Sequence, residues 1–308
     1  DRPGEALEQL VGPWVDAIGR SWFRASPLVG HAGRELLDFD EQQRIHRTIA
    51  EQTLASSQLD PILVNVAFSH ALIAESHQAL LKIAHSIVFA AESDLEMISD
   101  WMVTLRDQPT NRLIFPKSLP LSNLLRLAQV LILGPHASDE AIATAVAALF
   151  AEVAKEPDPV QRDRFFYIAT TKLFFKQALH GRIPQWFERL LQLREVVSRN
   201  PPIANHQRTL EQAHPEQPGL LETLFTFQAM GLRTIAELSA LFDAFDALTD
   251  DVRNEILCLP FAQRHGLLFI DAAWMKEHRR GTINGIDGAQ RFLRMAQQAE
   301  RWGQHELA

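Results

Sequence analysis

Residues 138–150, SDEAIATAVAALF, hold in one stretch the signals that decide the fold of this chain. Ser138 is a residue type that caps the N-terminus of a helix, and the acidic residues after it are favourable in a first turn. The alanines that follow form a face without bulky side chains, which allows another helix to approach closely. This stretch therefore predicts a helix that packs against other helices.

The same pattern extends in both directions along the chain. Asp40 is predicted to cap a helix whose Ile45, Ile49 and Leu54 point inward. Asp60-Pro61 is predicted to open the next helix, because proline is well placed in a first turn. Proline and glycine breakers, Pro201-Pro202 among them, separate the later stretches. Helices are predicted at 41–54, 62–91 with a break near Ser76, 93–106, 121–133, 138–155, 159–179, 183–198, 217–229, 234–247, 250–258, 264–278 and 287–302.

The number of predicted helices argues for a particular all-α architecture. They are too many for a single bundle, whereas stacked antiparallel pairs let each pair cover its neighbour's apolar face. The chain shows no clean 34-residue period with the tetratricopeptide (TPR) signature. We therefore expect residues 38–308 to form an α-solenoid of degenerate TPR-like helix pairs.

The first 37 residues differ from the rest. Residues 22–33, WFRASPLVGHAG, combine a strand-like run with a proline turn and two glycines. A preceding turn at Gly19-Arg20-Ser21 and the apolar Trp14 and Val15 complete the pattern of a β-hairpin. A helix followed by a hairpin is how a winged-helix domain ends, so residues 1–37 are predicted to be the C-terminal remnant of one.

Composition limits the possible classes of function. The chain has 308 residues, 46% hydrophobic and 22% charged, with a formal net charge of −8. That apolar content is enough for a sizeable core and argues against wholesale disorder, while the negative charge disfavours nucleic acid as a partner. No segment reaches the ~18 uncharged apolar residues of a membrane span. The lone Cys258 is expected to be a small buried hydrophobe, and the lack of disulfides suits the cytoplasm.

The motifs of several enzyme classes were sought in the sequence. It has no phosphate-binding loop G-x-x-x-x-G-K-[ST], no H-E-x-x-H, no C-x-x-C and no G-x-S-x-G. His70 and His77 would lie about 10 Å apart on one helix, too far for a shared metal ion. The aromatic stretch 165–175, FFYIATTKLFF, is better explained as a buried helix than as a ligand groove. The sequence thus predicts neither a metal site nor a cofactor in this chain.

One junction carries a resemblance to a known family. Phe23-Arg24-Ala25-Ser26-Pro27-Leu28-Val29, followed after an acidic linker by Ile45-His46-Arg47-Thr48-Ile49-Ala50, resembles a junction in STAND proteins, the signal-transduction ATPases with numerous domains. In that family a P-loop ATPase module precedes a winged helix, and helical repeats follow it. The resemblance implies that the chain is a piece of a larger protein, with the ATP-binding residues upstream and none to be carried over here.

These observations lead to a functional hypothesis. We expect a binding arm of a bacterial-type STAND signalling or defence NTPase, with a protein or other ligand in its concave groove and the ATPase module in cis. The alternatives are the repeat region of a transcriptional regulator and, less favoured, a stand-alone helical enzyme. Exposed arginine and aromatic side chains commonly dominate recognition. The expected partner-binding residues are Arg264, His265, Trp274, Arg279, Arg280 and Trp302.

Overall fold

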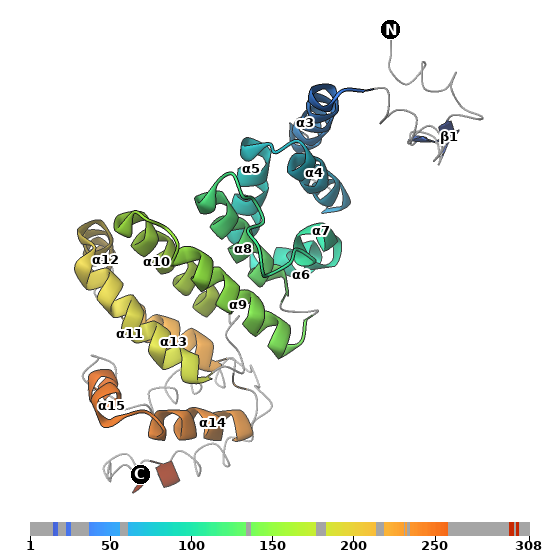
Figure 1. The fold of residues 1–308 in the computed structure, drawn as a ribbon. Helices are drawn as coiled ribbons and strands as arrows, with labels where there is room; N and C mark the ends of the chain where they lie inside the picture. Colours follow the sequence, from blue (N-terminus) through green and yellow to red (C-terminus); the bar gives the residue numbers. More distant parts are fainter. Residues whose placement is uncertain are drawn as a thin grey trace. The chain divides into compact units, whose positions relative to one another are not determined.

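The structure, a computed structural model, is built almost entirely of α-helices (Figure 1). It describes residues 15–17, 23–25, 37–55, 61–133, 137–176, 183–213, 219–230, 232, 235–257, 296–298, 300 and 301. The elements are β1 (Val15–Ala17), β2 (Phe23–Ala25), α3 (Phe39–Ala55), α4 (Pro61–Ile73), α5 (His77–Val88), α6 (Glu92–Trp101), α7 (Val103–Arg106), α8 (Leu119–Leu133), α9 (Asp139–Val153), α10 (Pro159–Phe175), α11 (Ile183–Arg199), α12 (Pro201–Ala213), α13 (Leu220–Met230), α14 (Ile235–Asp246) and α15 (Asp250–Leu257). The all-α class predicted from the sequence is confirmed.

The chain divides into two compact units, residues 1–83 and 84–308. In the first unit, β1 and β2 pair antiparallel, with Asp16 opposite Arg24. The assignment of this strand pair to a winged helix stays a prediction.

Helices α3 and α4 form the helical part of the first unit. They run antiparallel, because Gln43 near the start of α3 contacts Glu75 just beyond the end of α4. Both helices bury small side chains, Ala50 on α3 and Ala67 and Ala71 on α4. The expected inward position of Ile45 is wrong, since its side chain is 40% exposed.

The start of α3 also differs from the prediction. Asp38, not Asp40, accepts a hydrogen bond from the backbone N–H of Glu41 at 2.8 Å and caps the helix. Asp40 lies in the first turn, where its charge still favours the positive end of the helix dipole. The predicted break near Ser76 is confirmed, because α4 ends at Ile73 and α5 begins at His77.

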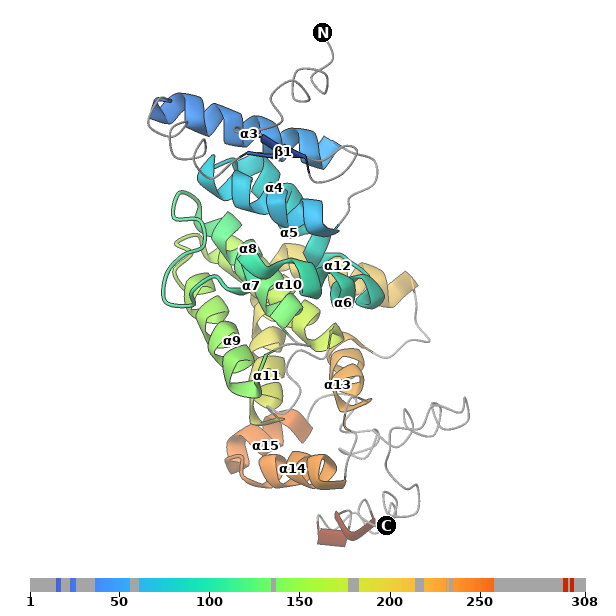
Figure 2. The same ribbon diagram turned by 90° about the vertical axis from the view of Figure 1, so that its right-hand side faces the viewer.

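In the second unit, helices pack on their neighbours in the chain. α8 packs on α9, α9 on α10, α10 on α11 and α11 on α12. More distant pairs also meet: α10 contacts α13, and α11 contacts both α14 and α15 (Figure 2). Helices α8, α9, α10 and α11 are therefore each covered by helices before and after them in the chain.

The aromatic core of the second unit lies where α11, α13 and α14 meet. Trp186 and Phe187 on α11 are fully buried, as is Phe225 on α13. The Phe187 ring centroid lies 5.7 Å from that of Phe225 and 5.7 Å from that of Phe245 on α14. Burying each such side chain stabilises the fold by about 1.5–3 kcal/mol, so this cluster holds the three helices together.

Two helix predictions need correction. Pro201-Pro202 does separate two helices, since α11 ends at Arg199, but no helix was predicted between residues 198 and 217, where α12 begins at Pro201. Proline fits there because the N–H it lacks has no partner in a first turn. The helix predicted at 93–106 is divided at Met102 into α6 and α7. Met102 is fully buried, so the break turns an apolar side chain into the core.

Other boundaries agree with the sequence. The cap predicted at Ser138 is confirmed, since its hydroxyl accepts a hydrogen bond from the backbone N–H of Ala141 at 3.3 Å. The aromatic stretch 165–175 lies in α10, where Phe174 is fully buried and Phe175 is 40% exposed. Among the described residues, no helix combines the length and the apolar character needed to cross a membrane.

Candidate functional site

The six residues predicted to bind a partner, Arg264, His265, Trp274, Arg279, Arg280 and Trp302, all lie outside the described residues. The same is true of Cys258. Their proposed role stays a prediction. The described part of the chain contains a different polar site, which the sequence analysis missed.

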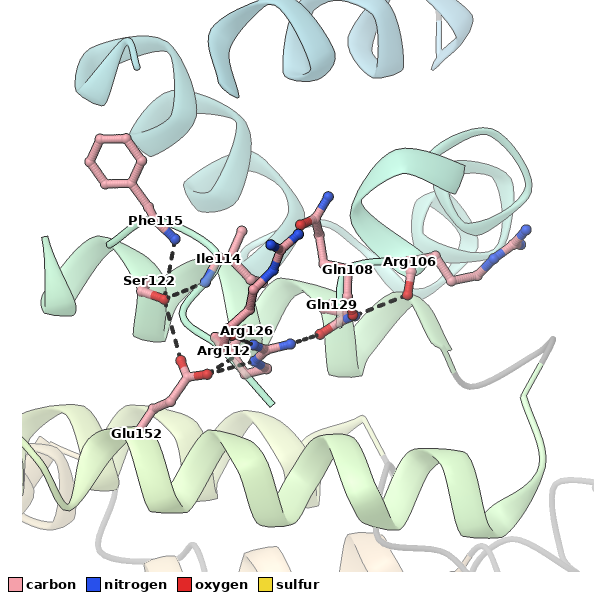
Figure 3. A network of polar contacts seen from close by, with 9 residues as sticks. All are labelled: Arg106, Gln108, Arg112, Ile114, Phe115, Ser122, Arg126, Gln129 and Glu152. Atoms are coloured by element: carbon pink, nitrogen blue, oxygen red, sulfur yellow. Dashed lines mark hydrogen bonds and ion pairs between the residues drawn. The ribbon is translucent and has the colours of Figure 1, made fainter. Parts of the chain in front are cut away.

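This site is centred on Arg126, a fully buried arginine in α8 (Figure 3). Its Nε and Nη2 atoms donate to Glu152 Oε1 on α9, at 3.0 and 2.9 Å. The side chains are 0% and 5% exposed, so the ion pair is shielded from water. A buried charge without a partner is strongly destabilising, and each of these two groups therefore requires the other.

Two further hydrogen bonds tie Arg126 to Gln129 on α8 and to the segment that joins α7 to α8. Nη1 donates to Gln129 Oε1 at 2.6 Å, and Nη2 donates to the backbone carbonyl of Arg112 at 2.6 Å. Gln129 in turn donates from Nε2 to the carbonyls of Arg106 and Gln108, at 2.9 and 2.6 Å. Side chains of α8 thus hold the last carbonyl of α7 and two backbone carbonyls of the connection.

Ser122, one turn before Arg126, holds the other side of the connection. Its Oγ accepts hydrogen bonds from the backbone N–H groups of Ile114 and Phe115, at 2.9 and 3.4 Å. It also donates to Glu152 Oε2 at 3.4 Å. We call Ser122, Arg126, Gln129 and Glu152 the Arg126 network, and Figure 3 shows it linking α8, α9 and the connection.

The sequence explains why the network forms here. Ser122, Arg126 and Gln129 are spaced four and three residues apart, so they form one stripe on α8. The connection before α8 contains Pro109 and Pro116, which interrupt regular structure and leave backbone groups in need of partners. An arginine as the single charge of an otherwise apolar helix was the signal that could have revealed the site.

An open pocket of about 450 Å³ lies against the network. Gln129 forms part of its lining, and the hydrogen bonds described above fix the orientation of that amide. The other polar lining residues come from the end of α7, from the connection and from α9. They include Arg106, Gln108, Thr110, Glu140 and Thr144.

The lining of the pocket mixes donors, acceptors and both signs of charge. Arg106 Nε lies 3.7 Å from Asp107 Oδ1, and Arg106 Nη1 donates to the Ser99 carbonyl at 3.2 Å. Thr144 and Glu140 are exposed on the α9 side. This arrangement suits a polar segment of a partner more than an apolar ligand, because most of the lining residues are polar or charged and none is aromatic.

Cations on aromatic rings join the helices after this site. The Arg189 guanidinium on α11 lies 3.7 Å from the ring centroid of Phe150 on α9 and 6.0 Å from that of Phe166 on α10. Burial lowers the pKa of Arg189, but an arginine remains charged at neutral pH. Between α10 and α11, Arg199 donates to both carboxylate oxygens of Asp163, at 2.9 and 2.6 Å. The α9–α11 segment is therefore held by charged contacts as well as by its core.

The histidines predicted to be too far apart for a metal site lie on separate helices, His70 on α4 and His77 and His85 on α5. Within the part of the chain that the structure describes, no three His, Cys, Asp or Glu residues group closely enough to hold a metal ion. Comparison of the chain with protein-family models, curated proteins and solved structures found no match.

Proposed function

We propose that this chain is the binding arm of a signalling protein, formed by helices that stack as pairs. The observation that carries the proposal is the order of packing in residues 84–308. Successive helices contact one another from α8 to α12. Helices that are not successive also contact one another, as α8 does α10, α10 does α13 and α11 does α14. Contacts between near neighbours of this kind are typical of helical-repeat arrays, which offer extended binding surfaces.

The pocket beside the Arg126 network is the proposed contact point for a partner. Gln129 is buried and both N–H groups of its amide are used by the carbonyls of Arg106 and Gln108, so it fixes the wall of the pocket before a partner binds. Preorganised groups favour affinity because less conformational entropy is lost. The mixed polar lining suggests that the partner inserts a polar protein segment there.

We further propose that the arm belongs to a STAND-type NTPase and restrains its ATPase module until a partner binds. The support is the resemblance of residues 23–29 and 45–50 to the junction at which helical repeats begin in that family. A transcriptional regulator with a repeat region is the second candidate, supported by the same helix packing. A stand-alone helical enzyme is the third.

The reading frame on the 5′ side of the Asp1 codon tests the family assignment directly. A G-x-x-x-x-G-K-[ST] motif encoded there, followed by a winged helix, is the expected result. A frame that encodes no nucleotide-binding module would overturn the STAND proposal. A DNA-binding domain encoded downstream of residue 308 would favour the regulator instead.

A photoreactive amino acid tests the contact point separately. Placed at Thr144, which lines the pocket, it should form a covalent adduct with a protein in the producing cells. The matched control is Ala151, which is also exposed on α9 but lies two turns away, about 10 Å along the helix axis. Equal adducts at both positions, or none at Thr144, would contradict a site in this pocket.

A further inference from the structure

Two histidine rings meet between α3 and α4 in the first unit. Nδ1 of His46 on α3 lies 2.6 Å from Nδ1 of His70 on α4, within hydrogen-bonding distance. The ring centroids are 4.8 Å apart and the ring planes are inclined by 36°. Both side chains are half-buried, so the contact is partly shielded from water.

This contact depends on how many protons the two rings carry. In the neutral pair, one ring donates from Nδ1–H and the other accepts at an unprotonated Nδ1. A first added proton can go to Nε2 of the donor ring, which leaves the bond between the rings intact. A second added proton must go to the accepting Nδ1, and two N–H groups then face each other with two positive charges.

Few other charges act on the pair. α4 carries no charged residue besides His70. At the end of α4, the Glu75 carboxylate accepts from the Gln43 amide at 3.4 Å, and on α5 Lys82 donates to the Leu54 carbonyl at the far end of α3. The remaining charged groups of the helical part of the unit are Asp40, Glu41, Arg44, Arg47 and Glu51 on α3, and His77 on α5.

The side chains of Arg44, Arg47, Glu51 and His77 are exposed, so water screens them. Burial lowers the pKa of His70 from its ordinary value of 6.5, and the charge of His46 lowers it further. No carboxylate contributes a compensating effect to that pKa. Burial is therefore the larger cause of the lowered pKa of His70, and His46 is the neighbouring charge that adds to it.

We propose that His46 and His70 form an acid-sensitive clasp, which holds α3 against α4 while at most one added proton is shared and loosens when both rings are charged. The clasp lies in the helix that resembles the start of the STAND repeats, but the proposal does not depend on that family assignment. It assigns the α3–α4 pair a response to acid that the proposed binding function does not include.

The direction of the response follows from the lowered pKa of His70. In the unfolded chain His70 takes up its proton around pH 6.5, whereas in the folded chain it does so only at lower pH. The stability of the α3–α4 pair is therefore full above pH 6.5 and falls as the pH drops below that value. It levels off below the folded pKa.

An NMR titration of the histidine Cε1–H groups in the full chain, with EDTA present, tests the coupling. We expect the His70 midpoint to lie below 6.5 and to move up towards it in His46→Gln, because the neighbouring charge is gone. The control His206→Gln, at an exposed position of α12, should leave the His70 midpoint in place. A midpoint unchanged by His46→Gln would overturn the proposal.

Hydrogen exchange tests the loosening itself. Protection in residues 39–55 and 61–73, corrected for intrinsic rates, should fall several-fold between pH 7.5 and pH 5. Residues 119–133 and 139–153 serve as an internal reference. His70→Gln should remove this pH dependence, and His46→Gln should reduce it, because burial still lowers the pKa of His70 in that variant. Protection in the wild-type chain that is equal at both pH values would refute the clasp.

Discussion

Helix pairs α3–α4 and α8–α9 have the same antiparallel arrangement but are joined by different polar groups. In α8–α9 the polar contact between the helices is the ion pair of Arg126 and Glu152, whose side chains are 0% and 5% exposed. In α3–α4 it is the half-buried contact of His46 with His70. The ion pair of α8 and α9 contains a guanidinium that stays charged at every physiological pH, whereas the contact of α3 and α4 contains His70, which takes up its proton only below pH 6.5.

The difference teaches how one architecture can hold a rigid region and a responsive one. Arg126 and Glu152 have already lost their hydration, so the α8–α9 contact persists as long as both partners are present. Keeping the two histidine rings in contact costs little free energy when both are neutral and much more when both are charged. We therefore expect substitutions in the Arg126 network to change stability strongly at any pH, and substitutions in the histidine pair to change mainly its pH dependence.

The largest effect is expected for Glu152→Ala. This change leaves Arg126 buried without its counter-ion, which should lower the free energy of unfolding by about 3–5 kcal/mol. Urea unfolding followed by circular dichroism measures it. The matched control Glu140→Ala, at an exposed position of the same helix, should cost less than about 0.5 kcal/mol.

A double variant shows where that cost comes from. Arg126→Met combined with Glu152→Leu leaves no charge unpaired, so it should recover part of the loss seen in Glu152→Ala. A single substitution that costs under about 1 kcal/mol would mean that water reaches the ion pair. The contrast with α3–α4 would then lose its basis.

A smaller effect is expected for Ser122→Ala. The hydroxyl satisfies the backbone N–H groups of Ile114 and Phe115, and its loss leaves them buried without that partner. The cost should be about 1–3 kcal/mol, and hydrogen exchange should accelerate first at Ile114 and Phe115. Exchange that instead rises evenly over the whole second unit would show that Ser122 acts on the core rather than on the connection.

A separate prediction concerns nucleotide binding by this chain. Because the sequence lacks a phosphate-binding loop, titration with millimolar Mg-ATP should give no heat of binding in a calorimeter. The same titration on a protein with a known P-loop is the positive control. A micromolar affinity of this chain for Mg-ATP would contradict the proposal that only a module in cis binds ATP.

The sequence predicted the helices better than the contacts between them. Periodicity and caps located α9 and the break between α4 and α5, because those signals act within a few residues. The same signals missed α12, because Pro201-Pro202 marks a break after α11 while proline is equally suited to the first turn of the next helix.

The two polar joins could not have been predicted in the same way. The Arg126–Glu152 pair spans 26 residues and the His46–His70 contact spans 24, distances over which periodicity carries no information. Arg126 in an apolar helix signalled that some partner must exist, but not which one. The histidines gave no signal, because a separation of 24 residues places His46 and His70 in no common helix or short motif.

The smallest effects are expected at the helix caps, which the two pairs share. Asp38 accepts from the Glu41 N–H at 2.8 Å at the start of α3, and Ser138 accepts from the Ala141 N–H at 3.3 Å at the start of α9. Replacing either with alanine should cost about 1 kcal/mol, since one N–H of the first turn loses its acceptor. The aspartate also carries a negative charge that interacts favourably with the helix dipole, so the loss of stability at Asp38 should shrink as salt is added, whereas the loss at Ser138 should not.

Unfolding measured at low and at high salt for Asp38→Ala, Asp38→Asn and Ser138→Ala separates the contributions of the hydrogen bond and of the charge. Asp38→Asn keeps the acceptor and removes the charge, so it should behave like the serine cap. A salt-independent loss in Asp38→Ala would mean that the cap works through its hydrogen bond alone, and the starts of α3 and α9 would then be held in the same way.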